Sequence, residues 1–182
     1  MFKDVVSCAG DATMLYVNRR GAGSRRGLVK IKVITLYQPW ASLVAIGVKR
    51  IETRSWATSF RGPLAIHAAK TFPKSARDLC GDDQFTFELV KGGYMRPDEL
   101  PRGAVIATCR LVGCKMIISM PTVAFNRPDV RYYTEGMSEQ EKAFGDYTPG
   151  RYVWILEDVK ILPEPIPEKG HQRLWNWEPP GG

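Results

Sequence analysis

The sequence predicts an α+β fold, in which several short strands form a small, mixed and partly open β-barrel that a few helices decorate. Three observations support this prediction. Short segments of β-branched or alternating residues recur along the chain, apolar residues three and four positions apart are confined to a few short stretches, and Pro or Gly residues separate the segments. Other α+β folds would fit the same pattern.

The first strands and the first helix are predicted in the segment that follows the basic N-terminal region. Residues 30–36 are rich in β-branched side chains and favour a strand. Pro39 suits the first turn of a helix, and Gly47 suits its end. Residues 51–54 alternate apolar and polar side chains, as a short strand does, whereas residues 64–68 are apolar enough for a buried strand.

The rest of the chain is predicted to contain helices at residues 73–79, 85–90 and 138–144 and strands at residues 104–118 and 152–161. The longer strand is expected to bend at Gly113. Proline then occupies alternate positions after residue 161, and we expect these prolines to prevent regular pairing, namely Pro163, Pro165 and Pro167.

The domain organisation follows from length and composition. A chain of 182 residues with 44% hydrophobic and 25% charged residues fits one globular domain with tails. Residues 19–27 are rich in Gly and Arg without an apolar period. We therefore expect a flexible basic arm at residues 1–30 and one domain at residues 31–178. The sequence does not predict the oligomeric state.

The sequence also predicts what the protein lacks. No apolar run approaches the roughly 20 residues that span a bilayer, and the N-terminus does not follow the order of a signal peptide. We therefore expect a cytoplasmic protein with no membrane partner. The four cysteines are scattered, which argues against a disulfide framework. Neither histidine lies at a zinc-finger spacing from a cysteine, so we expect no metal and no cofactor.

The positive charge is concentrated at the N-terminal end. The formal net charge is +7, to which residues 1–32 contribute +5, residues 33–70 contribute +4 and residues 71–182 contribute −2. Such a distribution favours a polyanionic partner, which we predict to be RNA or another nucleic acid or nucleotide. For the N-terminal arm, a role in solubility alone is an equally good interpretation.

The densest cluster of chemically useful side chains surrounds residues 51–54. If these residues form a strand, Glu52 and Arg54 project from one face, and Lys49 at the preceding turn would lean over the pair. Lys49 and Arg54 would bind phosphate, and Glu52 would accept a hydrogen bond from a base amine or a sugar hydroxyl. An ordinary surface ion pair is the alternative interpretation.

Polar and aromatic residues flank this cluster and complete the predicted ligand-binding set. Trp40 and Trp56 offer faces on which a base can stack, although two core tryptophans would have the same pattern. Gln38 and Ser42 belong to the same polar segment and add hydrogen-bonding groups.

Further candidates lie outside this cluster. His67 in an apolar strand, followed by Lys70, would bind phosphate or transfer a proton, while a hydrogen-bonded core histidine is an equally good interpretation. Arg151 follows a Pro-Gly turn and would reach a phosphate. Gln172 and Trp175 lie in a C-terminal tail that would fold over the cleft and supply a stacking face.

Four ordered segments resemble ASCH domains of the PUA-like superfamily. The motif Gly47-x-Lys49-x-x-Glu52-x-Arg54 resembles the G-x-K-x-x-E-x-R signature of that family. The preceding Gln38-Pro39-Trp40-Ala41 is similar to the segment that leads into the signature, including the domain at the end of a eukaryotic transcriptional coactivator. The sequences FGDYTPGRY at residues 144–152 and GHQRLWNW at residues 170–177 resemble bacterial and phage members, to which the chain looks closest.

The resemblance covers about residues 32–177 and implies a PUA-like barrel whose signature residues line a cleft. It also implies nucleic-acid binding, with RNA as the first candidate, or nucleotide binding through Lys49, Glu52 and Arg54. The alternative is a hydrolase, because one branch of the family removes the acetyl group from N4-acetylcytidine and other members are reported as ribonucleases. Lys49 and Glu52 would then be catalytic. That branch has a threonine at the position of Glu52, and Thr53 faces the other side of the strand, which argues against this activity.

Overall fold

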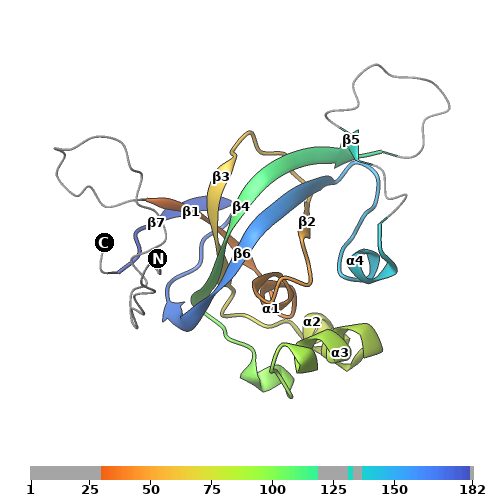
Figure 1. The fold of residues 1–182 in the computed structure, drawn as a ribbon, viewed down its shortest axis with the longest axis vertical. Coiled ribbons are helices and arrows are strands. Elements are labelled where there is room, and N and C mark those ends of the chain that lie inside the picture. Colours follow the sequence, from red (N-terminus) through yellow and green to blue (C-terminus); the bar gives the residue numbers. More distant parts are fainter. Residues whose placement is uncertain (1–29, 119–130, 133–136, 181–182) are drawn as a thin grey trace, which may run out of the picture.

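The computed structural model describes residues 30–118, 131–132 and 137–180. Within them, one curved seven-stranded sheet forms the body of the protein, with the strand order β2-β6-β4-β3-β1-β7 and with β5 paired to β4 outside that order (Figure 1). The strands are β1 (Ile31–Leu36), β2 (Ile51–Arg54), β3 (Gly62–Ala68), β4 (Ala104–Ile117), β5 (Arg131–Tyr132), β6 (Tyr152–Pro167) and β7 (Leu174–Trp177). The helices are α1 (Trp40–Ala45), α2 (Lys74–Asp78), α3 (Asp83–Lys91) and α4 (Glu139–Ala143), with short 3-10 turns η2 (Leu79–Gly81) and η3 (Pro97–Glu99).

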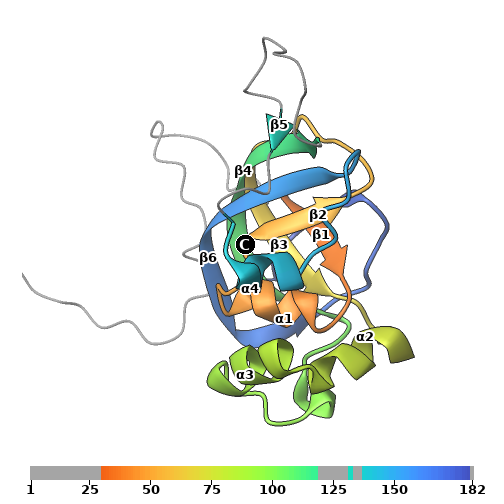
Figure 2. The same ribbon diagram turned by 90° about the vertical axis from the view of Figure 1, so that its right-hand side faces the viewer.

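The predicted mixed α+β architecture is present, and the sheet combines both pairing directions. β1 runs parallel to β3 and antiparallel to β7, whereas β4 is antiparallel to both β3 and β6. Figure 2 shows the sheet curling around its own inner face, with α2 and α3 lying together beyond α1 at one end. α1 therefore lies between the sheet and the other two helices.

The hydrophobic core lies on the inner face of this curved sheet. Ile34, Ile66, Leu111 and Trp154 come from four different strands and are buried together. One side of α1 packs on them through small side chains, which lets the helix approach the sheet closely. A second cluster joins the helices, where the rings of Phe85 and Phe144 meet edge to face with centroids 4.8 Å apart.

The sheet is not closed into the predicted barrel. Among the described residues, no backbone ladder joins β2 to β1 or β7. β7 pairs with β1 only as far as Ile34, so the next carbonyl, that of Thr35, is left without a β7 partner. The guanidinium of Arg54 on β2 donates to that carbonyl at 2.9 Å. A side chain therefore spans the gap at this point, and the gap stays open to form a cleft.

The prediction that the prolines prevent regular pairing holds for residues 162–165, none of which has a register partner on β4. The prolines do not end the strand, however, because β6 continues to Pro167 and pairing resumes at Ile166 and Pro167 after a shift in register. The next residue, Glu168, donates its N–H to the carbonyl of Gly103 at 3.0 Å. Successive backbone N–H groups alternate in direction, so the nitrogen of Pro167 faces away from β4, where proline loses no ladder bond.

No helix in the described part of the chain is long and apolar enough to cross a membrane. The predicted basic arm lies outside the described residues except for Lys30.

Candidate functional site

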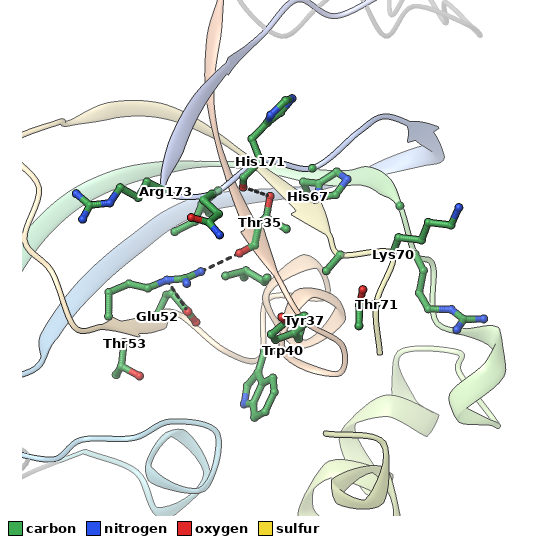
Figure 3. A pocket seen from close by; sticks show the side chains of 18 of the residues that line it. Thr35, Tyr37, Trp40, Glu52, Thr53, His67, Lys70, Thr71, His171 and Arg173 are labelled. Carbon is green, nitrogen blue, oxygen red and sulfur yellow. Dashed lines mark hydrogen bonds and ion pairs between the residues drawn. The ribbon is translucent and has the colours of Figure 1, made fainter. Parts of the chain in front are cut away.

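A cleft of about 1420 Å³ lies at the open side of the sheet, between the end of β1 and the short strand β2. Its walls also include the end of β3, the loop after α4 and the segment that follows β6. Figure 3 shows Thr35, Tyr37, Trp40, Glu52 and His67 around this space. The cleft exists because β1 and β2 diverge, so a backbone ladder does not fill the gap between them.

Glu52 and Arg54 lie together in this cleft. The Nε atom of Arg54 is 3.2 Å from Oε1 of Glu52, and both side chains remain partly accessible. Arg54 also donates through Nη2 to the Thr35 carbonyl. The period of the β2 strand puts both side chains on one face, as expected. The pair presents guanidinium N–H donors next to a carboxylate acceptor.

Lys49 does not lie over that pair, contrary to the sequence prediction. It is 1% exposed and does not line the cleft. Its ammonium donates to the Ile51 carbonyl and lies 3.6 Å from Oε1 of Glu141 on α4. The helix α4, far away in sequence, brings a carboxylate to the turn before β2, and this carboxylate draws the lysine away from the cleft.

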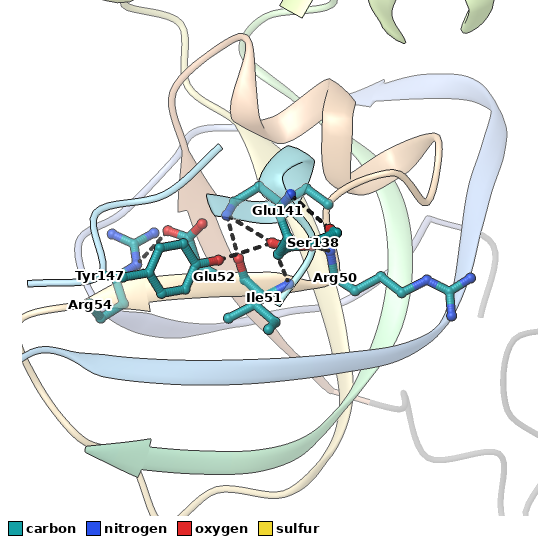
Figure 4. Close-up of polar contacts among 8 residues, drawn as sticks. Arg50, Ile51, Glu52, Arg54, Ser138, Glu141 and Tyr147 are labelled. Carbon is teal, nitrogen blue, oxygen red and sulfur yellow. Dashed lines mark hydrogen bonds and ion pairs between the residues drawn. The ribbon is translucent and has the colours of Figure 1, made fainter. Parts of the chain in front are cut away.

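Glu141 ties α4 to the start of β2. Its carboxylate accepts the backbone N–H groups of Arg50 at 3.0 Å and Ile51 at 3.3 Å, and the hydroxyl of Tyr147 at 3.1 Å (Figure 4). With the nearby ammonium of Lys49, this carboxylate has three hydrogen-bond donors and one cation around it within the described part of the chain. Glu141 and Lys49 therefore act in positioning β2, and the sequence analysis did not identify Glu141.

Gln38 and Ser42 also lie away from the cleft, because both are fully buried. Gln38 accepts the N–H of Ser42 at 3.0 Å and donates to the carbonyl of Pro101 at 2.7 Å. These two predicted ligand-binding residues instead connect the start of α1 to the loop that enters β4.

The predicted aromatic residues Trp40 and Trp56 line the cleft, together with Tyr37, which is 50% exposed. The ring of Trp56 meets that of Trp154 edge to face, with centroids 4.7 Å apart. The guanidinium of Arg173 lies 5.7 Å from the centroid of the Trp56 ring. One face of the cleft thus offers aromatic surface next to cations, an arrangement that suits stacked bases.

Residues 168–173, which we call the C-terminal strap, close one side of the cleft. His67 donates from Nε2 to the carbonyl of Glu168 at 3.0 Å, and the hydroxyl of Thr35 donates to the carbonyl of His171 at 3.0 Å. The indole N–H of Trp175 donates to the same hydroxyl at 3.2 Å. Trp175 itself does not line the cleft, so this predicted stacking residue supports the strap instead.

His67 is buried and is held as a neutral imidazole. Burial lowers the pKa of His67 from its ordinary value, an effect larger than the opposing influence of Glu168. Its Nε2 donates its proton to the carbonyl of Glu168, and its Nδ1 has no hydrogen-bond partner among the residues that the structure describes. Gly170 lies directly against this nitrogen. A second proton on Nδ1 would therefore be buried without an acceptor.

Acid is expected to destabilise the fold through His67. Because the pKa is lowered in the folded state, the unfolded chain takes up the proton first, so the free energy of unfolding falls as the pH drops below about 6.5. Urea titrations between about pH 7 and pH 5 will measure this fall. It should be smaller in His67→Gln and nearly the same in His171→Gln, because the charge of His171 is the smallest of the influences on the pKa of His67. An equal fall in the wild type and in His67→Gln would contradict the assignment.

The remaining predicted residues, Lys70, Arg151 and Gln172, all line the cleft. Arg151 is the most constrained, with its Nε 3.3 Å from the carboxylate of Asp146 and its Nη2 donating to the Thr53 carbonyl at 3.4 Å. Within the described ranges, no group of three His, Cys, Asp or Glu side chains could hold a metal ion.

The cleft also contains basic residues that were not predicted from the sequence, namely Arg102, Lys169 and Arg173. No local pattern marks them. Arg102 and Lys169 lie beside Gly and Arg173 directly precedes β7, all three outside regular strands and helices, where isolated cations are ordinary surface residues.

Comparison with known families identifies the domain. The model of the ASCH domain matches residues 34–160, which include the motif around Glu52 and Arg54 and most of the sheet. The chain belongs to the ASCH domain family. The C-terminal strap and β7 of this ASCH domain follow the matched region.

Two curated relatives are similar to this ASCH domain. Activating signal cointegrator 1 of Homo sapiens is 29% identical over 145 residues, and that of Mus musculus is 28% identical over 145 residues. Each alignment covers 78% of this chain and 21% of the relative, so the chain spans about a fifth of their length. Both relatives are mammalian, so the expected closeness to bacterial and phage members is not supported.

Proposed function

We propose that this ASCH domain binds single-stranded nucleic acid, with RNA as the first candidate, in the cleft beside Glu52 and Arg54. The observation that carries the proposal is the lining of the cleft, which combines six Lys or Arg side chains and three Asp or Glu side chains with exposed aromatic surface. Cations attract the phosphate backbone, and aromatic faces stack on bases of any sequence. The basic arm at residues 1–30 would add sequence-independent affinity to the domain at residues 31–178.

The Glu52–Arg54 pair suits a base or a sugar better than a phosphate. The charge of Arg54 is already balanced by a carboxylate 3.2 Å away. The pair therefore offers a donor and an acceptor side by side, as the edge of a base requires. Tyr37 and Trp40 lie between this pair and the far end of the cleft, where they provide apolar surface (Figure 3).

Replacing Arg54 is expected to weaken RNA binding. Arg54→Gln removes charged hydrogen bonds, which should reduce affinity about tenfold. Arg173→Gln should also weaken binding, and it leaves the hydrogen bond from Arg54 to the Thr35 carbonyl intact. Fluorescence anisotropy with a labelled single-stranded RNA and the matching DNA will measure both affinities. Arg110→Gln removes an exposed cation outside the cleft and serves as the control.

Two outcomes would contradict this function. One is wild-type protein that binds neither RNA nor DNA at low salt. The other is equal affinity in Arg54→Gln, Arg173→Gln and Arg110→Gln, since binding would then not involve the cleft. Circular dichroism spectra of all three variants will show whether a lost affinity reflects lost folding.

The alternative activity, hydrolysis of a modified nucleoside or of RNA by Lys49 and Glu52, has less support. Lys49 is paired with Glu141 and does not line the cleft. The side chain at the position of the expected catalytic threonine is that of Glu52, which is paired with Arg54. Without the lysine beside it, Glu52 supports ligand binding more directly than it supports hydrolysis.

A further inference from the structure

Three cations from distant parts of the chain meet at one end of the cleft. Lys70 follows β3, Arg102 precedes β4 and Lys169 follows β6, and all three line the cleft. Within the described part of the chain, none of the three takes part in an ion pair. Of the three other arginines of the cleft, Arg54 and Arg151 each have a carboxylate partner, whereas Arg173 lies over the ring of Trp56.

Backbone hydrogen bonds bring the segments with these cations together. Gly103 donates to the carbonyl of Ala68 at 2.8 Å, and Glu168 donates to the carbonyl of Gly103 at 3.0 Å. A Cβ atom on Gly103 would lie 3.6 Å from the Cβ of Lys70. Lys70, Arg102 and Lys169 lie one or two positions along the chain from these bonded residues and are therefore close neighbours in space.

The loop with Arg102 is held from the inside of the protein. The buried side chain of Gln38 donates to the carbonyl of Pro101 at 2.7 Å, while its own carbonyl accepts the N–H of Ser42. Arg102 thus extends from an anchored loop. This anchoring favours a defined site over a mobile surface arginine.

The charge at this end of the cleft is unbalanced. One carboxylate, that of Glu168, lies among the three cations, and its Oε1 accepts the N–H of Lys169 at 2.9 Å. Three positive charges and one negative charge leave a net excess of positive charge, which a bound anion would neutralise. Figure 3 shows Lys70 on the opposite side of the cleft from Glu52, with Thr35, Tyr37 and Trp40 between them.

We propose that Lys70, Arg102 and Lys169 form a phosphate-binding end of the cleft. It takes a phosphate of the nucleotide whose base or sugar contacts Glu52 and Arg54, so the bound strand has a fixed direction across the cleft. This inference rests on the proposed function, because it assigns a place to one part of the same ligand. Phosphate oxygens suit the site, because the guanidinium of Arg102 and the ammonium groups of the two lysines are hydrogen-bond donors without acceptors, and phosphate oxygens accept hydrogen bonds.

The salt dependence of RNA binding tests the phosphate-binding end. Each phosphate that the protein neutralises on a single strand contributes about 0.7 to the steepness of the plot of log K against log salt. Loss of this one phosphate site in the triple variant Lys70→Gln/Arg102→Gln/Lys169→Gln should therefore make the slope shallower by about 0.7. The matched control, Lys74→Gln/Arg110→Gln/Lys160→Gln, removes the same charge from residues outside the cleft lining and should leave the slope unchanged. Equal slopes in the two triple variants would overturn the inference while the cleft function stands.

A second measurement separates this inference from the proposed function. In nuclear magnetic resonance titrations with inorganic pyrophosphate, the amide signals of Gly103 and Gly170 should shift in the wild type and not in the cleft triple variant. If wild-type protein binds no RNA but shows these shifts, the proposed function fails and the anion site stands. If pyrophosphate causes no shift at these amides, the anion site is overturned.

Discussion

Glu141→Ala is expected to lower the free energy of unfolding by about 3 kcal/mol, because it leaves a buried ammonium without its carboxylate. Lys49 is 1% exposed, and its charge is balanced by Glu141 at 3.6 Å. The same substitution leaves the backbone N–H groups of Arg50 and Ile51 without their acceptor. Urea denaturation at neutral pH will measure the loss.

Two further variants make this prediction specific. Glu139→Ala removes a carboxylate from the same helix, but that side chain is 82% exposed and, among the described residues, pairs with Lys142 alone, so its effect should stay within about 0.5 kcal/mol. Adding Lys49→Met to Glu141→Ala should recover part of the loss, since an apolar pair often replaces a buried ion pair without cost. Equal stability of Glu141→Ala and Glu139→Ala would show that the lysine does not depend on this contact.

A loss of this size would also assign a role to the lysine of the ASCH signature in this chain. Lys49 would be a structural residue that holds the turn before β2 against α4. The chemistry of the cleft would then depend on the other two charged residues of the signature, Glu52 and Arg54.

Gly170→Ala is expected to displace the C-terminal strap and to cost about 2 kcal/mol of folding free energy. A Cβ atom at this position would lie 2.5 Å from Cε1 and 2.9 Å from Nδ1 of His67, far inside normal contact distance. The imidazole cannot easily move, because it is buried and donates to Glu168 on the strap itself. Since the strap lines the cleft, RNA affinity should fall as well. Urea denaturation and the anisotropy assay will measure the two effects.

The control for this glycine is Gly81→Ala. A Cβ atom on Gly81 would meet no heavy atom within 4 Å, so this substitution should have little effect on stability or binding. The double variant Gly170→Ala/His67→Ala makes room for the new methyl group and should bind RNA better than Gly170→Ala. If the single and double variants lose affinity equally, the contact between strap and histidine does not control the cleft.

Features that depend on neighbouring residues could be predicted from the sequence. Alternation along β2 puts Glu52 and Arg54 on one face, because successive side chains of a strand point in opposite directions wherever the strand lies. The helix α1 ends just before Gly47, which has a positive φ of 79°. This agrees with the prediction that Gly47 ends the helix. The family motif is equally local, since it is a matter of spacing.

Only the tertiary structure decided which of these residues share a site. Lys49 faces Glu141 and not Glu52 because α4 packs against the start of β2, and no spacing within the motif indicates that contact. Lys70, Arg102 and Lys169 are far apart in the chain and become neighbours through the ladder that connects β3, β4 and β6. The sheet stays open, too, because the carbonyl of Thr35 accepts a side-chain donor from Arg54 where a strand partner would otherwise pair. The sequence by itself thus determined the helices, five of the seven strands and the family, but not β5 and β7. The cleft and its charge distribution arise from contacts between segments that only the whole topology brings together.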